Sequence, residues 1–103
     1  MGADLCILGM GLDGHFASIF PSMKIEYKCD KNVFFYCKNN LNNEIRVSLT
    51  QEFIGQAKNI YLLIKGNEKL EMLVKYLASG EKNIPIVDFL SKNLAKVTVF
   101  LIK

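Results

Sequence analysis

The sequence predicts an α/β fold, with a mostly parallel sheet and helices on both faces. Three short runs, at residues 5–8, 60–64 and 97–102, are almost continuously apolar, as strands are when both faces of a parallel sheet are covered. Two segments with helical features lie between the second and third runs, which indicates a strand–helix–helix–strand crossover. The chain has 103 residues, 50% of them hydrophobic, so we expect one small domain over residues 1–103.

The first helical segment combines an apolar stripe with two capping signals. Four aliphatic residues follow the i, i+3, i+4, i+7 spacing of one buried helix face: Leu70, Leu73, Val74 and Leu77. Asn67 is the expected N-cap, and Gly80 is the expected glycine after the last turn. A second helix is predicted to begin near Pro85, a residue suited to a first helical turn. Its inward-facing residues are predicted to be Val87, Leu90 and Leu94.

The middle of the chain is more polar. Residues 33–37 and 45–49 are strand-like and are separated by an asparagine-rich loop with the sequence KNNLNNE. Residues 22–32 are polar and weakly patterned, so we expect them to form a surface excursion.

Composition narrows the classes of partner and location. The net charge is only +3 and the charged residues are scattered, so nucleic acid is not an expected partner. No apolar run approaches the roughly 20 residues that span a bilayer, and no secretory signal opens the chain, so we expect a cytoplasmic protein without a membrane contact. Cys6, Cys29 and Cys37 lack metal-ligand spacing and His15 is the only histidine, so no metal site is predicted.

Residues 9–14 read G-x-G-x-x-G directly after the first predicted strand. This pattern holds a dinucleotide when the last glycine opens a long helix and an acidic residue ends the next strand. Here Pro21 stops any helix after little more than one turn, and residues 33–37 lead into Lys38. A dinucleotide site is therefore not predicted.

The same residues also fit a strand, a glycine turn and a short helix that together present a histidine. Gly11 and Gly14 would let the backbone approach a ligand closely, and the amides of the helix N-terminus would attract an anion or a developing oxyanion. His15 would lie in the first helical turn, where the positive helix end disfavours its protonated form. A neutral imidazole can act as a general base. The alternative is that His15 only hydrogen-bonds the loop.

Two cations are candidate anion ligands. Lys69 lies in the first turn of a predicted helix, where it opposes the helix dipole unless an anion such as a sugar phosphate is bound there. Arg46 is the only arginine, and its planar fork suits phosphate or other substrate oxygens. The alternatives are a solvated surface lysine and a salt bridge from Arg46 to Glu44 or another carboxylate.

Three segments, in order, resemble one family. The sequence LGMGLDGHFASIFP at residues 8–21 resembles the G-x-G-x-D-G-H-x-A-S-L-F-P signature of 6-phosphogluconolactonases, within the sugar-phosphate isomerase/deaminase superfamily. RVSLT at residues 46–50 is similar to the family's R-[IV]-[ST]-L-T strand. LLIKGNEKLEML at residues 62–73 is similar to its L-L-V-T-G-x-x-K-A-x-x-L segment.

The resemblance implies hydrolysis of 6-phosphoglucono-δ-lactone to 6-phosphogluconate, in the oxidative pentose phosphate pathway and without a cofactor. It implies that His15 is the base that activates water and that Asp13 shapes the turn and orients His15. It also implies that Gly11 and Gly14 let the backbone approach the substrate closely. Arg46 and Lys69 are implied to bind the substrate or its phosphate. For Asp13, capping of the short helix is the alternative role.

The chain also departs from the family pattern. Phe16 replaces a small polar threonine and Lys65 replaces the threonine before Gly66, and we expect both changes to alter the pocket rim. Family members have an N-terminal half with a Gly/Ser-rich phosphate loop that has no counterpart here, so the resemblance covers a C-terminal half. We therefore expect exposed apolar surface and self-association, or pairing with a missing N-terminal half.

Two other functions are compatible with the same motifs. The missing phosphate loop leaves open a non-catalytic sugar-phosphate-binding fragment. A glucosamine-6-phosphate deaminase-like isomerase shares G-x-x-D-G-H but continues with Ala-Phe-Asn-Glu-Pro. The sequence Ile19-Phe20-Pro21 lacks that acidic residue, which favours the lactonase.

Overall fold

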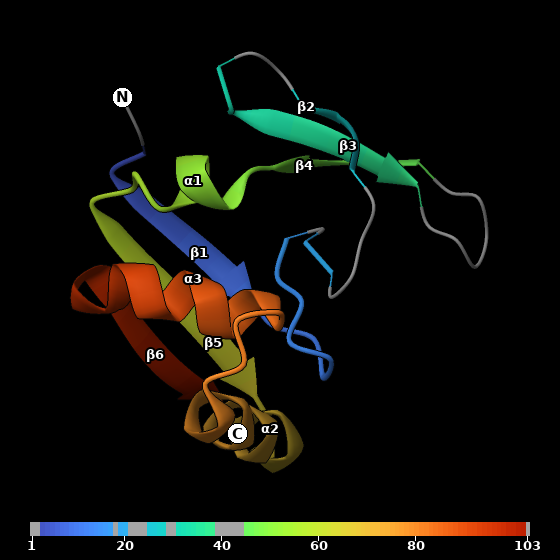
Figure 1. The fold of residues 1–103 in the computed structure, drawn as a ribbon. Coiled ribbons are helices and arrows are strands. Elements are labelled where there is room, and N and C mark those ends of the chain that lie inside the picture. The colour runs from blue at the N-terminus through green and yellow to red at the C-terminus, as the bar shows by residue number, and fades with distance from the viewer. Residues whose placement is uncertain (1–2, 18, 21–24, 29–30, 39–44, 103) are drawn as a thin grey trace.

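The computed structural model describes residues 3–17, 19–20, 25–28, 31–38 and 45–102. The elements along the chain are β1 (Leu5–Gly9), β2 (Ile25–Lys28), β3 (Phe34–Lys38), β4 (Ile45–Leu49), α1 (Gln51–Ile54), β5 (Asn59–Lys65), α2 (Asn67–Ser79), α3 (Pro85–Asn93), the 3-10 turn η1 (Leu94–Lys96) and β6 (Val97–Ile102) (Figure 1).

The three predicted apolar strands form one parallel sheet in the order β1-β5-β6. Cys6 pairs with Ile60 across the first ladder, and Leu62 pairs with Val99 across the second. The crossover from β5 to β6 runs through α2 and α3, so the predicted α/β class and parallel sheet are confirmed. A second, antiparallel sheet has the order β2-β3-β4 and contains both strands predicted in the middle of the chain.

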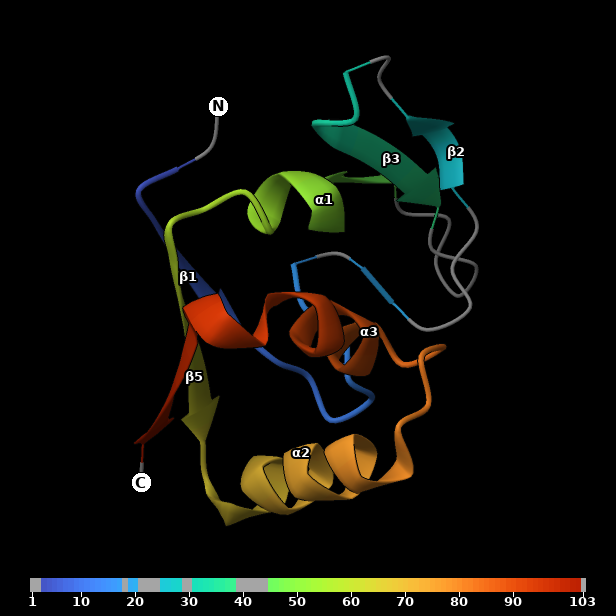
Figure 2. The same ribbon diagram turned by 60° about the vertical axis from the view of Figure 1, so that its left-hand side comes forward.

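The core lies between the parallel sheet and α3. Ile60, Leu62 and Ile64 alternate along β5 and are fully buried, in the same core cluster as the buried residues of α3. Figure 2 shows α3 running beside the parallel sheet. Phe89 of α3 packs against Phe16, with ring centroids 4.8 Å apart. Each such side chain stabilises the fold by about 1.5–3 kcal/mol through removal of its apolar surface from water. The sheet and α3 thus form the rigid base for the loop that follows β1.

The opposite face of the sheet is open in the described part of the chain. Its exposed residues come from the two outer strands: Leu5, Ile7, Phe100 and Ile102. The continuous apolar runs predicted helices on both faces, whereas the described helices bury the face that carries Ile60, Leu62 and Ile64. On the outer strands, the hydrophobic residues of this face therefore form an exposed apolar surface that the described helices do not cover.

The two long helices differ from prediction in which residues face the core. α2 begins at Asn67 after an N-cap at Gly66, so Asn67 is the first helical residue and not the cap. Leu73 is buried, but Val74 is 60% exposed and Leu77 is also exposed, because the buried stripe turns toward Tyr76 and the loop after β1. Gly80 ends the helix in a left-handed conformation, as predicted.

In α3 the predicted inward residues Val87 and Leu90 are buried. Leu94 is 72% exposed, so its predicted inward position is wrong. The reason is that α3 ends at Asn93 and the chain tightens into η1 before β6, which rotates the next side chain away from the core.

Two short elements had no sequence signal that predicted them. β2 lies within the segment expected to be an irregular excursion, and its four residues are too few to show a period. α1 is a single turn capped by Thr50, whose hydroxyl accepts a hydrogen bond from the Phe53 amide at 3.1 Å. Among the described residues, every helix is too short or too polar to cross a bilayer.

The exposures of Leu90 and Leu94 predict different costs for the same substitution. Leu90 is 3% exposed, so Leu90→Ala should lower the free energy of unfolding by about 2–5 kcal/mol through loss of burial and formation of a cavity. Leu94→Ala is the matched control and should change it by less than about 0.5 kcal/mol. Urea denaturation of the two variants measures the difference, and equal losses would contradict this description of the core.

Candidate functional site

The loop after β1 lies at the carboxyl edge of the parallel sheet. Gly9 at the end of β1 pairs with Leu63 near the end of β5, so this loop and the start of α2 leave the same edge. The described residues of the loop form a tight turn and an isolated bridge between Phe16 and Ile19. The predicted short helix is therefore wrong, and with it both the helix-dipole argument for His15 and the capping role of Asp13.

Hydrogen bonds within the turn replace those of the expected helix. The Gly11 amide donates to the His15 carbonyl at 2.9 Å, and the Gly14 amide donates to the Gly11 carbonyl at 3.0 Å. The chain therefore closes on itself around residues 11–15. A loop with its own backbone hydrogen bonds satisfied can hold a side chain in one place without a helix.

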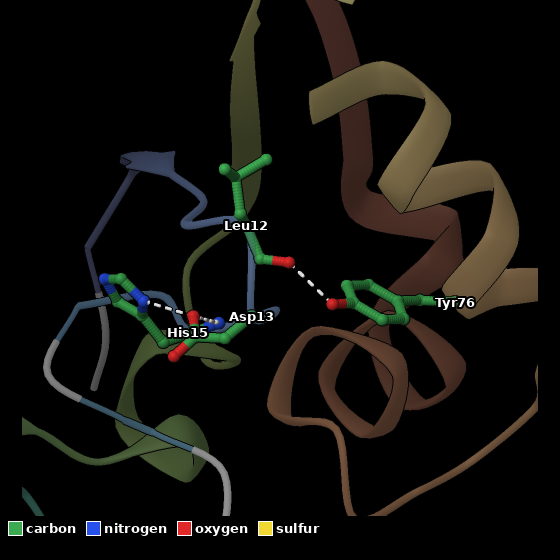
Figure 3. A network of polar contacts seen from close by, with 4 residues as sticks. All are labelled: Leu12, Asp13, His15 and Tyr76. Atoms are coloured by element: carbon green, nitrogen blue, oxygen red, sulfur yellow. Dashed lines mark hydrogen bonds and ion pairs between the residues drawn. The ribbon is translucent and has the colours of Figure 1, made fainter. Parts of the chain in front are cut away.

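Two further hydrogen bonds fasten this turn to the helices. The Tyr76 hydroxyl of α2 donates to the Leu12 carbonyl at 2.6 Å (Figure 3). The Ile86 amide, in the first turn of α3, donates to the Gly14 carbonyl at 3.0 Å. Tyr76 belongs to the site by this contact, although its place in the sequence did not mark it. The crossover helices thus determine where the turn sits.

His15 and Asp13 form a close pair within the turn. The Asp13 Oδ1 atom accepts a hydrogen bond from the His15 amide at 3.1 Å and lies 2.6 Å from the His15 Nδ1 atom. Partial burial raises the pKa of the Asp13 carboxyl, but the hydrogen bonds and the charge of His15 outweigh this effect and lower that pKa below its ordinary value.

The ionised carboxylate determines the tautomer of the neutral imidazole. A carboxylate only accepts hydrogen bonds, so the Nδ1 atom of His15 must carry the proton that faces Asp13. The Nε2 atom then holds the free lone pair, and Figure 3 shows it on the side of the ring away from Asp13. The His15 side chain is 33% exposed, so the pair is open to solvent. This arrangement can accept a proton from a water molecule.

The two predicted glycines are each required by close contacts. A Cβ atom on Gly11 would lie 2.1 Å from Cε1 and 2.2 Å from Nδ1 of the His15 ring. Gly14 has φ +84°, and a Cβ atom there would lie 2.4 Å from a methyl carbon of Ile84. Gly11 therefore makes room for the imidazole, and Gly14 lets the turn meet α3.

Arg46 is linked to this cluster through an aromatic ring. The Phe20 ring stacks on the His15 imidazole with centroids 4.5 Å apart and an angle of 28° between the planes. The Arg46 guanidinium carbon lies 5.8 Å from the centroid of the same Phe20 ring. Glu44, the salt-bridge partner considered for Arg46, lies outside the described residues. Sequence reasoning did not identify Phe20 as a site residue, because nothing in its spacing showed that its ring would meet His15.

Lys69 is placed on the same edge of the sheet but apart from this cluster. It is the third residue of α2 and is half-buried, and no described contact joins it to His15. A polar groove of about 280 Å³ between α1 and α3 includes neither of the two side chains in its lining. The structure thus gathers Gly11, Asp13, Gly14, His15 and Arg46 and leaves Lys69 at the start of α2.

The two departures from the family pattern lie in different environments. Phe16 is 1% exposed and belongs to the core, so the expectation that it alters a pocket rim is wrong. The larger ring is accommodated because it packs on Phe89. Lys65 is exposed at the end of β5, on the edge from which α2 begins.

The lowered pKa of Asp13 predicts a pH dependence of stability. Because the folded pKa lies below the unfolded value of about 3.9, the contribution of the ionised carboxylate is complete above that value and is lost as the pH falls through the folded pKa. Asp13→Asn should remove this loss of stability at acid pH. The effect on the free energy of unfolding should be less than about 1 kcal/mol, because the Asp13 side chain is 53% exposed. Urea denaturation between about pH 5 and 2 measures it. If the free energy of unfolding falls equally with pH in the wild-type chain and in Asp13→Asn, Asp13 is not the carboxylate responsible for the loss.

Comparisons with known proteins agree with the three sequence motifs. Residues 1–99 match the family model described as glucosamine-6-phosphate isomerases/6-phosphogluconolactonase. The 6-phosphogluconolactonase of Haemophilus influenzae is 38% identical over 82 residues, which are 80% of this chain and 34% of that protein. The 6-phosphogluconolactonase 4 of Saccharomyces cerevisiae is 30% identical over 102 residues, which are 95% of this chain and 40% of that protein.

Solved structures give the same result. The 6-phosphogluconolactonase of Shewanella baltica superposes with a TM-score of 0.80 at 27% identity, covering 97% of this chain and 44% of that one. The Trypanosoma brucei 6-phosphogluconolactonase superposes with a TM-score of 0.73 at 34% identity, covering 97% and 40%. The chain spans less than half the length of these relatives. The match over residues 1–99 shows that it belongs to the glucosamine-6-phosphate isomerase/6-phosphogluconolactonase family.

Proposed function

We propose that this chain carries the base of a lactone hydrolase that converts 6-phosphoglucono-δ-lactone to 6-phosphogluconate. The observation that supports it most is the pairing of His15 Nδ1 with an ionised Asp13, which leaves Nε2 as an accessible proton acceptor. The substrate is inferred from the relatives named 6-phosphogluconolactonase. In this proposal the reaction belongs to the oxidative pentose phosphate pathway in the cytoplasm.

His15 acts as a general base and then as a general acid. Its Nε2 atom takes a proton from water, and the resulting hydroxide attacks the lactone carbonyl carbon to form a tetrahedral oxyanion. The oxyanion collapses, the ring C–O bond breaks, and the imidazolium returns its proton to the departing alkoxide. Water is the only co-reactant, so the step needs no cofactor. Asp13 holds the required tautomer and stabilises the imidazolium through Nδ1.

Backbone and cationic groups bind the substrate. Gly11 and Gly14 contribute by close approach within the protein: Gly11 leaves room for the His15 imidazole, and Gly14 lets the turn pack against Ile84, so that the base is held where the lactone binds. Arg46 lies near the same Phe20 ring that contacts His15 and offers donors to substrate oxygens. Lys69, at the amino end of α2, binds the phosphate together with the free amides of that helix end.

The whole enzyme is expected to need more than this chain. The lactonases named above are more than twice as long, and the open sheet face carries exposed side chains of Leu5, Ile7 and Phe100. We propose that this face pairs with an N-terminal half, or with a second copy when that half is absent. A sugar-phosphate-binding fragment without turnover is the second candidate, and the short span relative to the lactonases favours it.

Removal of the imidazole tests the catalytic role. His15→Ala should lower kcat for lactone hydrolysis by about 10²–10⁴, the usual contribution of general base catalysis, with a smaller change in KM. Hydrolysis is followed by acid release and corrected for the spontaneous rate. Equal rates for the wild-type chain and His15→Ala would defeat the lactonase proposal.

Ligand binding tests the phosphate site and separates the two candidates. Millimolar 6-phosphogluconate should raise the melting temperature of the wild-type chain, because a ligand that binds only the folded state stabilises it. Lys69→Ala should abolish the rise, and Lys75→Ala, an exposed lysine on the same helix, should retain it. A rise without turnover would support the binding fragment. A rise that persists in Lys69→Ala would contradict the role of Lys69.

A further inference from the structure

We propose that Phe20 is the positioning residue for His15: its ring holds the imidazole plane, so that Nε2 points to the substrate, and it sets the place of Arg46 beside it. The kinetic consequence rests on the proposed function, whereas the structural consequence does not.

The contact is a stack of two planar rings. The centroids lie 4.5 Å apart with 28° between the planes, which is within the range of favourable aromatic stacking. Both His15 and Phe20 are half-buried, so the stack covers one face of the imidazole while the ring remains accessible from other directions.

Asp13 alone does not determine the orientation of the imidazole. Its hydrogen bond to Nδ1 holds one atom of the ring and only partly restricts rotation about the Cα–Cβ and Cβ–Cγ bonds of the His15 side chain. Such a rotation would swing Nε2, on the opposite side of the ring. A flat surface parallel to the imidazole removes that freedom, and Phe20 supplies it. Gly11, which has no side chain, leaves the space that the Nδ1–Cε1 edge of the ring occupies.

The same ring connects two distant parts of the chain. Arg46 lies on β4, in the antiparallel sheet, and its guanidinium carbon is 5.8 Å from the Phe20 centroid, a cation–π distance. His15 lies on the loop after β1. The only arginine and the only histidine of the chain therefore contact the same ring.

The test replaces the ring while keeping an apolar side chain. Phe20→Leu should lose the upfield ring-current shift of the His15 ring protons, whereas Phe20→Tyr should retain it. Proton NMR reads this directly, since His15 is the only histidine. Phe53→Leu, at a half-buried phenylalanine of α1, is the matched control and should leave the His15 signals unchanged. If Phe20→Leu melts early, Phe20→Met provides the second apolar variant.

Kinetics then separate this inference from the lactonase proposal. Misplacement of a base by about 1 Å costs up to about 100-fold, so Phe20→Leu should lower kcat by about 10- to 100-fold, with Phe20→Tyr near wild type. Unchanged His15 signals in Phe20→Leu would overturn the positioning role, whatever the activity. The opposite outcome has two parts: the His15 signals shift in Phe20→Leu, and the rate of lactone hydrolysis is unchanged by His15→Ala. That outcome would support the stack and overturn the lactonase proposal.

Discussion

The hydrogen bond between the His15 Nδ1 atom and Asp13 exists because position 11 has no side chain. A Cβ atom there would occupy the space of the imidazole ring, only 2.1 Å from Cε1. The turn that brings these groups together is itself held by Gly14, whose carbonyl accepts from α3 and whose φ of +84° suits glycine. The site therefore depends on close backbone packing more than on any single side chain, and the helices that bury the core also locate His15.

The packing of α3 connects stability to the site. Ile60, Leu62 and Ile64 on β5 receive the buried face of α3, and the first turn of that helix donates the Ile86 amide to the loop after β1. Phe16, next to His15, is inserted into the same core against Phe89. A histidine one-third exposed to solvent is thus flanked by a residue that is fully buried. This is how a loop without helical structure can hold the His15 side chain in place.

The chain reproduces a coherent part of a larger family fold. Two lactonase structures superpose on nearly all of it, although it spans less than half of each. The parallel sheet, both crossover helices and the histidine turn are all present, whereas one sheet face shows apolar side chains such as Ile7 and Phe100 to solvent. The histidine turn and the exposed apolar face therefore both belong to the part of the fold that this chain shares with the lactonases.

The sequence by itself determined the parallel strands, the crossover helices, the glycine turn and the family, because these depend on local patterns: continuous apolar runs, caps such as Gly80, and residues that are close along the chain, such as Asp13 and His15. Only the tertiary structure decided that the turn is not helical, that Leu94 faces solvent, and that the Phe20 ring contacts both His15 and Arg46. The physical reason is that helix ends, ring orientations and the direction of a buried stripe are set by the neighbour that each surface meets. Several of those neighbours are far apart in the sequence, as Tyr76 and Ile86 are from the turn and Arg46 is from Phe20.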